Sequence, residues 1–92
     1  MALQILSSPS SPENTTESLR EAIAKALPAA EIEVRTAGAG HFEIRVVSET
    51  FEGKSRVAQQ QAVYGAIAHL MKGDAAPVHA IDKLETLTPQ PG

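Results

Sequence analysis

The chain has 92 residues, a formal net charge of −3 at pH 7 and no cysteine. A chain of this length forms one small domain with a thin core. That core must be largely aliphatic, because the sequence contains two phenylalanines, one tyrosine and no tryptophan. The lack of cysteine excludes disulfides, a cysteine nucleophile and cysteine-based zinc sites, so any thiolate ligand must come from another molecule. The negative charge argues against strong nonspecific nucleic-acid binding, and no apolar run approaches the ~20 residues of a membrane span.

The first fourteen residues differ in composition from the rest of the chain. Residues 1–14 are rich in serine and proline, and we expect a disordered N-terminal tail there. The tail has neither the apolar core of a secretory signal nor the arginines of a mitochondrial transit peptide, which leads us to expect a cytoplasmic protein. The folded domain is expected over residues 15–89, followed by a short C-terminal tail at 90–92.

A first helix is expected over residues 14–27. Asn14 and Glu17 have the spacing of a capping box, with asparagine in place of serine or threonine, and Pro28 ends the helix. Its apolar residues recur with helical spacing and form one stripe: Leu19, Ala22, Ile23, Ala26 and Leu27. This stripe must lie against another apolar surface.

Two strands follow the first helix. Apolar and charged residues alternate strictly over Glu31–Thr36 and over His41–Val47. The short segment between them, residues 37–40, contains two glycines. This pattern predicts a β-hairpin with one covered face and one face exposed to water or covered by a partner.

Residues 51–71 form the most periodic stretch of the chain and predict a tight turn that leads into one long helix. Gly53 can supply the positive φ of the turn, and Ser55 is expected to cap the helix. Gln60 lies within the expected apolar face, where a buried amide would need hydrogen-bond partners. Seven residues are expected on that face: Val57, Val63, Tyr64, Ile67, Ala68, Leu70 and Met71. Four are expected on or near the other side: Gln59, Gln61, His69 and Lys72.

The last expected strand covers residues 78–88. Its apolar residues change parity midway, which predicts a β-bulge near Asp82 or Lys83. The element order is therefore αββαβ. We predict an α+β fold, in which both helices pack on one face of a three-stranded mixed sheet and a right-handed crossover makes the last strand parallel to one hairpin strand.

No catalytic motif is present. The sequence contains no G-x-S-x-G elbow and no phosphate-binding glycine motif between a strand and a helix. Because no set of residues assembles into a catalytic site, we predict that the protein is not an enzyme.

The turn before the long helix is a candidate binding surface. An αββαβ order with a glycine turn before a helix resembles a KH module, whose G-x-x-G loop clamps a nucleotide backbone. Gly53, Lys54 and Arg56 occupy this turn, with Arg56 in place of the second glycine. Two cations at a helix N-terminus favour an anionic surface of a nucleic acid or a partner. The alternative is a solvated basic turn.

Two histidines open strands and are candidate metal ligands. His41 begins the second expected strand, and His79 lies near the start of the third. If these strands are neighbours, both imidazoles can reach one rim of the sheet. Imidazole binds borderline metals and can replace cysteine on one iron of a [2Fe–2S] cluster. The alternative is that each ring is structural or exposed.

Residues 19–89 as a whole resemble the BolA family. Five features carry the resemblance: the His-Phe strand start at His41, the VVS-x-x-FEGKSRV segment from Val46 to Val57, the Gln-Gln-x-Val-Tyr helix from Gln60 to Tyr64, the V-H-A entry from Val78 to Ala80, and the closing T-x-T-P from Thr86 to Pro89. The resemblance implies a class II KH-like αββαβ fold, the same order as derived above.

The resemblance also implies a function. BolA-like proteins are adaptors that pair with monothiol glutaredoxins and share a [2Fe–2S] cluster with them, in iron–sulfur trafficking and iron homeostasis. Some bacterial members are described as stress-linked DNA-binding transcription regulators, which is the alternative function. The family's cluster ligand corresponds to His79, the glutaredoxin and glutathione would supply thiolates, and no cofactor is expected in the isolated chain. The chain alone is expected to be a monomer or a weak homodimer.

The sequence departs from the family pattern at two places near the histidines. The loop at residues 37–40 lacks the second histidine or cysteine ligand of eukaryotic members, which leaves His41 as the nearest substitute. The last strand is one residue longer than the family pattern between the His-Ala pair and the closing Thr-Pro, in agreement with a bulge.

Overall fold

The computed structural model describes residues 12–73 and 76–90. Its elements follow the predicted αββαβ order. They are helix α1 (Pro12–Ala26), strands β1 (Glu31–Thr36) and β2 (His41–Val47), the 3₁₀ turn η1 (Glu49–Phe51), helix α2 (Arg56–Ile67), the 3₁₀ turn η2 (Ala68–Leu70) and strand β3 (Ala80–Leu87).

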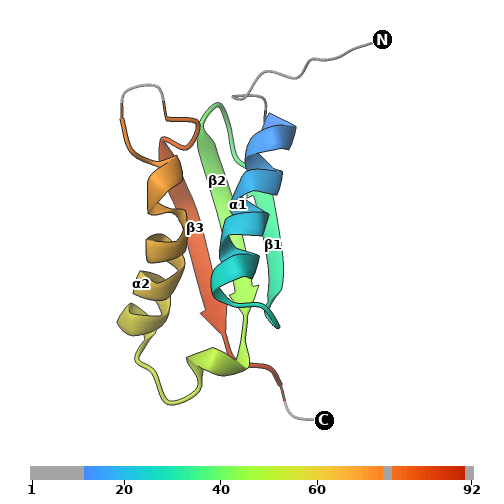
Figure 1. Ribbon diagram of the computed structural model, residues 1–92, viewed down its shortest axis with the longest axis vertical. Coiled ribbons are helices and arrows are strands. Elements are labelled where there is room, and N and C mark those ends of the chain that lie inside the picture. The colour runs from blue at the N-terminus through green and yellow to red at the C-terminus, as the bar shows by residue number, and fades with distance from the viewer. Residues whose placement is uncertain (1–11, 74–75, 91–92) are drawn as a thin grey trace.

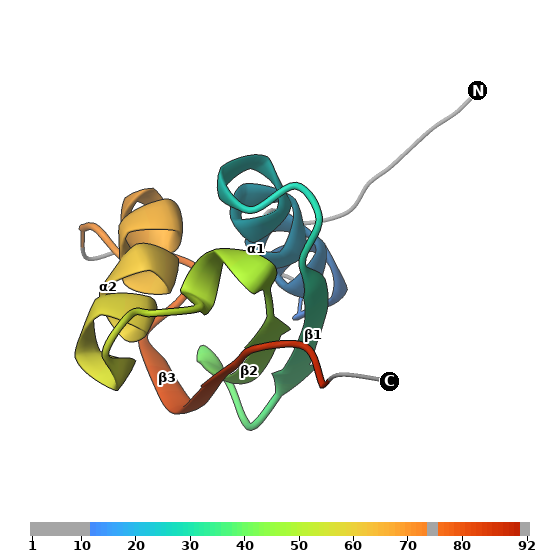
Figure 2. The ribbon, with the colours of Figure 1, turned by 90° about the horizontal axis from the view of Figure 1, so that it is seen from below.

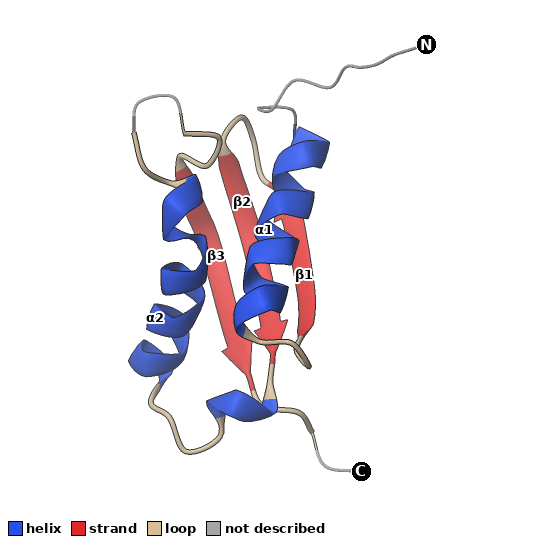
Figure 3. Cartoon of the chain, viewed as in Figure 1, coloured by secondary structure: helices blue, strands red, loops and turns tan. Residues whose placement is uncertain are grey.

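The three strands form a mixed sheet with β2 at its centre (Figure 1). β1 and β2 are antiparallel, whereas β2 and β3 are parallel. Figure 2 shows α1 and α2 side by side on the same face of the sheet, and Figure 3 shows the same separation of helices from strands. The predicted α+β fold is confirmed, including the parallel crossover to β3.

A β-bulge interrupts β3 where the parity of its apolar residues changes. Phe42 pairs with Ile81, but the next residue, Glu43, pairs with Lys83. Asp82 therefore has no partner in the ladder and is the extra residue of the bulge. The prediction of a bulge near Asp82 or Lys83 is confirmed, and the strand itself is shorter than the predicted range 78–88 because the ladder begins at Ala80.

The core lies between the helices and the sheet. Apolar residues recur with helical spacing in α1 and at every second position in β1 and β2. They therefore lie on one face of each element and meet in one layer. The buried apolar cluster consists of Leu19, Ile23, Leu27, Val34, Phe42, Ile44, Val46, Phe51, Val63, Ile67 and Val78. It contains both phenylalanines of the chain, in agreement with the expectation that the rest of the core is aliphatic.

The opposite face of the sheet carries alternating charges. Two rows cross the three strands: Glu33–Arg45–Glu85 and Arg35–Glu43–Lys83. Arg35 lies 3.5 Å from Glu43, and Arg45 lies 3.7 Å from Glu85. These exposed pairs each contribute at most about 1 kcal/mol, but opposite charges in adjacent positions favour the observed strand register. Within the described residues, no element of this chain covers this face, and whether a partner covers it stays open.

Helix α1 begins earlier than predicted. Its first residue is Pro12, so Pro12 to Asn14 belong to the helix and not to the tail expected over residues 1–14. Proline suits the first helical position because its fixed φ is helical and the amide hydrogen that it lacks would be unpaired there. The prediction of Asn14 as the cap is therefore wrong, since Asn14 lies inside the first turn. The remainder of the expected tail, residues 1–11, and residues 91–92 at the C-terminus lie outside the described residues.

Helix α2 begins as predicted but ends sooner. The hydroxyl of Ser55 accepts a hydrogen bond of 3.1 Å from the amide of Ala58, which confirms the cap. The helix ends at Ile67 and continues as η2, not as one long helix to residue 71. Residues three apart stack in a 3₁₀ turn, so this tighter winding keeps Leu70 on the same side as Ile67, where it packs against the core.

The buried face of α2 is narrower than predicted. Val63 and Ile67 are fully buried, but Val57 is 62% exposed and Tyr64 is 39% exposed. At 100° per residue, Val57 and Tyr64 point about 100–120° away from Val63, and the described structure has no element on that side to cover them. Their assignment to the buried face is wrong, as is that of Ala68, which is exposed.

Gln59 takes the role that was expected of Gln60. Its amide nitrogen donates to the carbonyl oxygens of Phe51 and Lys54 at 3.1 and 3.0 Å. Its amide oxygen accepts from the hydroxyl of Thr86 at 2.8 Å. Gln59 therefore joins η1, the start of α2 and the end of β3, and it satisfies the hydroxyl of a threonine that is only 8% exposed.

We expect Ser55→Ala to lower the free energy of unfolding by about 1 kcal/mol, because the amide of Ala58 loses its acceptor. Urea unfolding followed by circular dichroism measures this change. Ser18→Ala, the same substitution at an exposed position inside α1, is the control and should cost nothing, since alanine is the better residue within a helix. Equal losses in the two variants would contradict the capping role.

Within residues 12–73 and 76–90, no helix combines the length and the apolar character needed to cross a bilayer.

Candidate functional site

The parallel pairing of β2 and β3 brings the two candidate ligands to one end of the sheet. His41, the first residue of β2, pairs with Ala80, the first residue of β3. His79 directly precedes Ala80, so both histidines lie at the rim where these strands begin, at the top of Figure 1. The condition under which both imidazoles reach one rim, that these two strands are neighbours, is therefore met.

His79 combines a fixed backbone with an exposed side chain. Its amide donates a 2.8 Å hydrogen bond to the carbonyl oxygen of Gly40. On its N-terminal side, Val78 is 1% exposed and belongs to the core. The His79 residue itself is exposed, and neither ring nitrogen has a hydrogen-bond partner among the described residues. The imidazole is thus available to bind a group outside the chain.

His41 makes a contact that the sequence did not predict. Its Nδ1 lies 2.9 Å from Oδ1 of Asp82, the extra residue of the bulge. Both side chains are partly exposed, at 45% and 41%. With Nδ1 engaged, only Nε2 of His41 can bind another group. Histidines that bind metals commonly donate their other nitrogen to a carboxylate, so the contact suits a ligand as well as a plain surface pair, and His41 as a ligand stays a prediction.

The rim does not complete a metal site by itself. In the described part of the chain, no group of three or more histidine, cysteine or acidic residues is placed to hold a metal ion. The chain has no cysteine, so thiolate donors at this rim can come only from another molecule.

The glycine turn lies at the other end of the molecule. Gly53 has a φ of +78°, which confirms the expected turn. Lys54 and Arg56 are exposed at the start of α2, at the bottom of Figure 1 and far from the histidines. Exposed Glu49 and Glu52 precede them along the chain and offset their charge. Nucleic-acid or partner binding at Gly53, Lys54 and Arg56 stays a prediction that is separate from the histidine rim.

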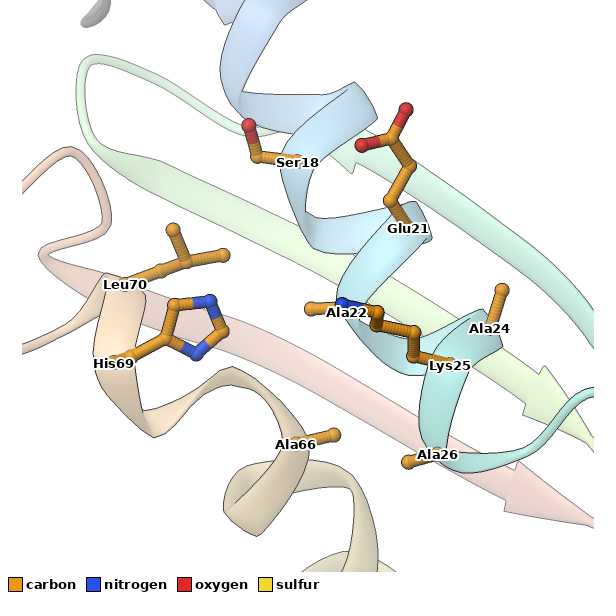
Figure 4. Close-up of a pocket in the computed structure, with 9 residues that line it drawn as sticks. All are labelled: Ser18, Glu21, Ala22, Ala24, Lys25, Ala26, Ala66, His69 and Leu70. Atoms are coloured by element: carbon orange, nitrogen blue, oxygen red, sulfur yellow. The ribbon is translucent and has the colours of Figure 1, made fainter.

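A groove of about 920 Å³ separates the two helices. It exists because alanines of the two helices face one another and leave space between them (Figure 4). Its lining residues are Ser18, Glu21, Ala22, Ala24, Lys25, Ala26, Ala66, His69 and Leu70. His69, predicted to be solvated, is exposed at this groove. The groove itself was not predicted, although the alanine-rich pattern of both helices was its sequence signal.

The chain also matches a known protein family. The family model described as BolA-like protein matches residues 9–91, nearly the whole chain. The chain belongs to the BolA family. Its BolA-like sequence is 40% identical over 67 residues to an uncharacterized protein in the rpoN-murA intergenic region of Acinetobacter guillouiae, over 72% of this chain and 76% of that protein. It is 38% identical over 58 residues to the acid stress protein IbaG of Escherichia coli, over 62% of this chain and 66% of IbaG.

The fold is shared with solved BolA structures. BolA1 from Arabidopsis thaliana superposes with a TM-score of 0.71 and 26% identity, over 85% of this chain and 98% of that structure.

Proposed function

We propose that this BolA-like protein is a non-enzymatic adaptor that shares a [2Fe–2S] cluster with a monothiol glutaredoxin and glutathione, with His79 as its ligand. It would act in the cytoplasm, in iron–sulfur trafficking and iron homeostasis. The observation that carries the proposal is the exposed imidazole of His79 at the rim of the sheet, free of hydrogen-bond partners among the described residues.

The residues present fit this role. A nitrogen ligand can take the place of cysteine on one iron of a [2Fe–2S] cluster. The chain supplies imidazoles but no thiolate, which matches a division in which the partner brings the sulfur donors. When bound, the cluster would supply iron and sulfide for transfer between proteins.

The chain's own contribution is to hold one imidazole in place. The hydrogen bond from the His79 amide to Gly40 and the burial of Val78 fix the backbone on which the ring stands. A ligand on a rigid backbone loses less conformational freedom on binding.

We expect His79→Ala to abolish the interaction with a cluster-loaded monothiol glutaredoxin. Visible circular dichroism reports the environment of the cluster iron, so addition of the wild-type protein to the loaded glutaredoxin should change the spectrum. The His79→Ala variant should leave it unchanged because it offers no nitrogen ligand. Comparison with His41→Ala decides whether His41 contributes a second nitrogen.

The matched control is His69→Ala, which removes an exposed imidazole that lines the groove between the helices and belongs to neither strand start. This variant should change the spectrum as the wild-type protein does. The proposal fails if wild-type protein has no effect on the spectrum, or if His79→Ala acts like the wild type.

A further inference from the structure

The ring of His79 lies directly on Gly40. A Cβ atom built at Gly40 would stand 2.7 Å from Nδ1, 2.8 Å from Cγ and 3.2 Å from Cβ of His79. These three distances place the point out of the plane of the ring, above its Nδ1–Cγ bond. One α-hydrogen of Gly40 therefore points at the ring from above this bond, and neither ring nitrogen has a hydrogen-bond partner among the described residues.

Gly40 also fixes the backbone beneath the ring. Its carbonyl oxygen accepts hydrogen bonds from the amides of both His79 and Ala80, at 2.8 and 3.1 Å. The residue therefore contacts His79 twice, through its carbonyl oxygen and through its Cα. Both contacts are with the residue that the proposed function identifies as the ligand.

The close approach is specific to this glycine. Gly73 has a similar positive φ, +87° against +75°, but no described atom lies within 4 Å of its Cβ position. A positive φ explains why glycine suits both turns. Among the glycines that the structure describes, only Gly40 would bring an added Cβ closer than 3.0 Å to another atom.

We propose that Gly40 is a positioning residue for His79: its bare Cα is the surface on which the imidazole lies, and this contact holds the ring nitrogens toward the rim. Any side chain at position 40 would push the ring away from this orientation. Its consequence for cluster binding rests on the proposed function, but the contact between Gly40 and His79 can be measured without a cluster.

The first test is NMR of the isolated wild-type protein. A proton over the face of an aromatic ring is shielded, so the two α-protons of Gly40 should differ in chemical shift, with one moved upfield. They should also show NOEs to the ring protons of His79. The upfield shift and the NOEs should both be lost in His79→Ala. Degenerate α-protons without such NOEs would overturn the positioning role.

The second test compares Gly40→Asn with Gly73→Asn in the glutaredoxin experiment. Asparagine tolerates a positive φ better than other residues with a side chain, so both variants carry similar backbone strain, and only Gly40→Asn adds an atom against the ring. We expect Gly40→Asn to weaken binding to the loaded glutaredoxin by about 10-fold, the lower end of the effect of residues that orient metal ligands. Gly73→Asn should bind as the wild type does.

The outcomes separate the two proposals. If the wild-type protein binds the loaded glutaredoxin and folded Gly40→Asn binds equally well, Gly40 is not a positioning residue while the proposed function stands. If the NMR contact is present but the wild-type protein leaves the cluster spectrum unchanged, the contact stands and the proposed function fails. Unfolding curves of both asparagine variants show which measurements come from folded protein.

Discussion

Phe51→Ala is expected to lower the free energy of unfolding by about 3–5 kcal/mol, a large part of the 5–15 kcal/mol that is typical of a small domain. Phe51 is fully buried in the apolar cluster, although it lies in the short turn η1. Truncation of its ring leaves a cavity below the point where β2 turns toward α2. Because a small domain loses roughly 4–8 °C in melting temperature per kcal/mol, the midpoint should fall by roughly 12 °C or more. Thermal and urea unfolding followed by far-UV circular dichroism measure both quantities.

Tyr64→Ala is the control for this substitution. It also removes an aromatic ring, but from a residue that is 39% exposed on the outer side of α2. Tyr64→Ala should lower the free energy of unfolding by at least about 2 kcal/mol less than Phe51→Ala does, because less apolar surface leaves the core. If the two variants lost equal stability, the placement of Phe51 inside the core and of Tyr64 outside it would be wrong.

The strands could be predicted closely because their sequence alternates without interruption. The bounds of β1 and β2 agree with the predicted ranges Glu31–Thr36 and His41–Val47. Successive side chains of a strand point to opposite faces. Strict alternation of apolar and charged residues therefore identifies both the strand and its buried side. The bulge in β3 was predictable for the same reason, since an extra residue is what reverses parity.

The buried face of α2 was harder to predict because a helix offers more than two directions. Val57 and Tyr64 are apolar and share a broad arc with Val63, but the width of the covered arc depends on how far α1 and the sheet reach around the helix. That is a property of the packed structure and not of the helix sequence. The same limit explains why Gln59, and not Gln60, became the residue that joins three elements.

The candidate site was also predictable only in part. Topology alone placed His41 and His79 at one rim, because parallel strands begin at the same end. The partners of the two rings were not predictable in this way. The contact of His41 with Asp82 depends on which residue leaves the ladder, and the contact of His79 with Gly40 depends on the backbone conformation of the hairpin loop.

We expect deletion of Asp82 to preserve the fold, with a change in stability of about 1 kcal/mol or less. Asp82 has no partner in the ladder, so its removal leaves Ile81 opposite Phe42 and Lys83 opposite Glu43 in a regular strand. No residue that faces the helices changes side. The one predicted loss is the exposed contact with His41, and such surface pairs contribute little.

Deletion of Leu84, two positions further along β3, is expected to cost more than about 2 kcal/mol. Leu84 pairs with Ile44 on the face that the helices cover and packs against the core. If the bulge persists after the deletion, Glu85 takes this position; if the strand becomes regular instead, Lys83 takes it. A charged side chain meets the apolar layer in either case, and burial of an unpaired charge is strongly unfavourable.

Urea unfolding of the two deletion variants compares a residue outside the ladder with one inside it. Interstrand NOEs in the Asp82 deletion should still pair Ile44 with Leu84, since the inward residues keep their partners. The bulge would be essential to the sheet, and not an addition to it, if loss of Asp82 destabilised the protein as much as loss of Leu84. In the expected case, the extra residue serves the rim: it places a carboxylate beside His41 without disturbing the strand that follows His79.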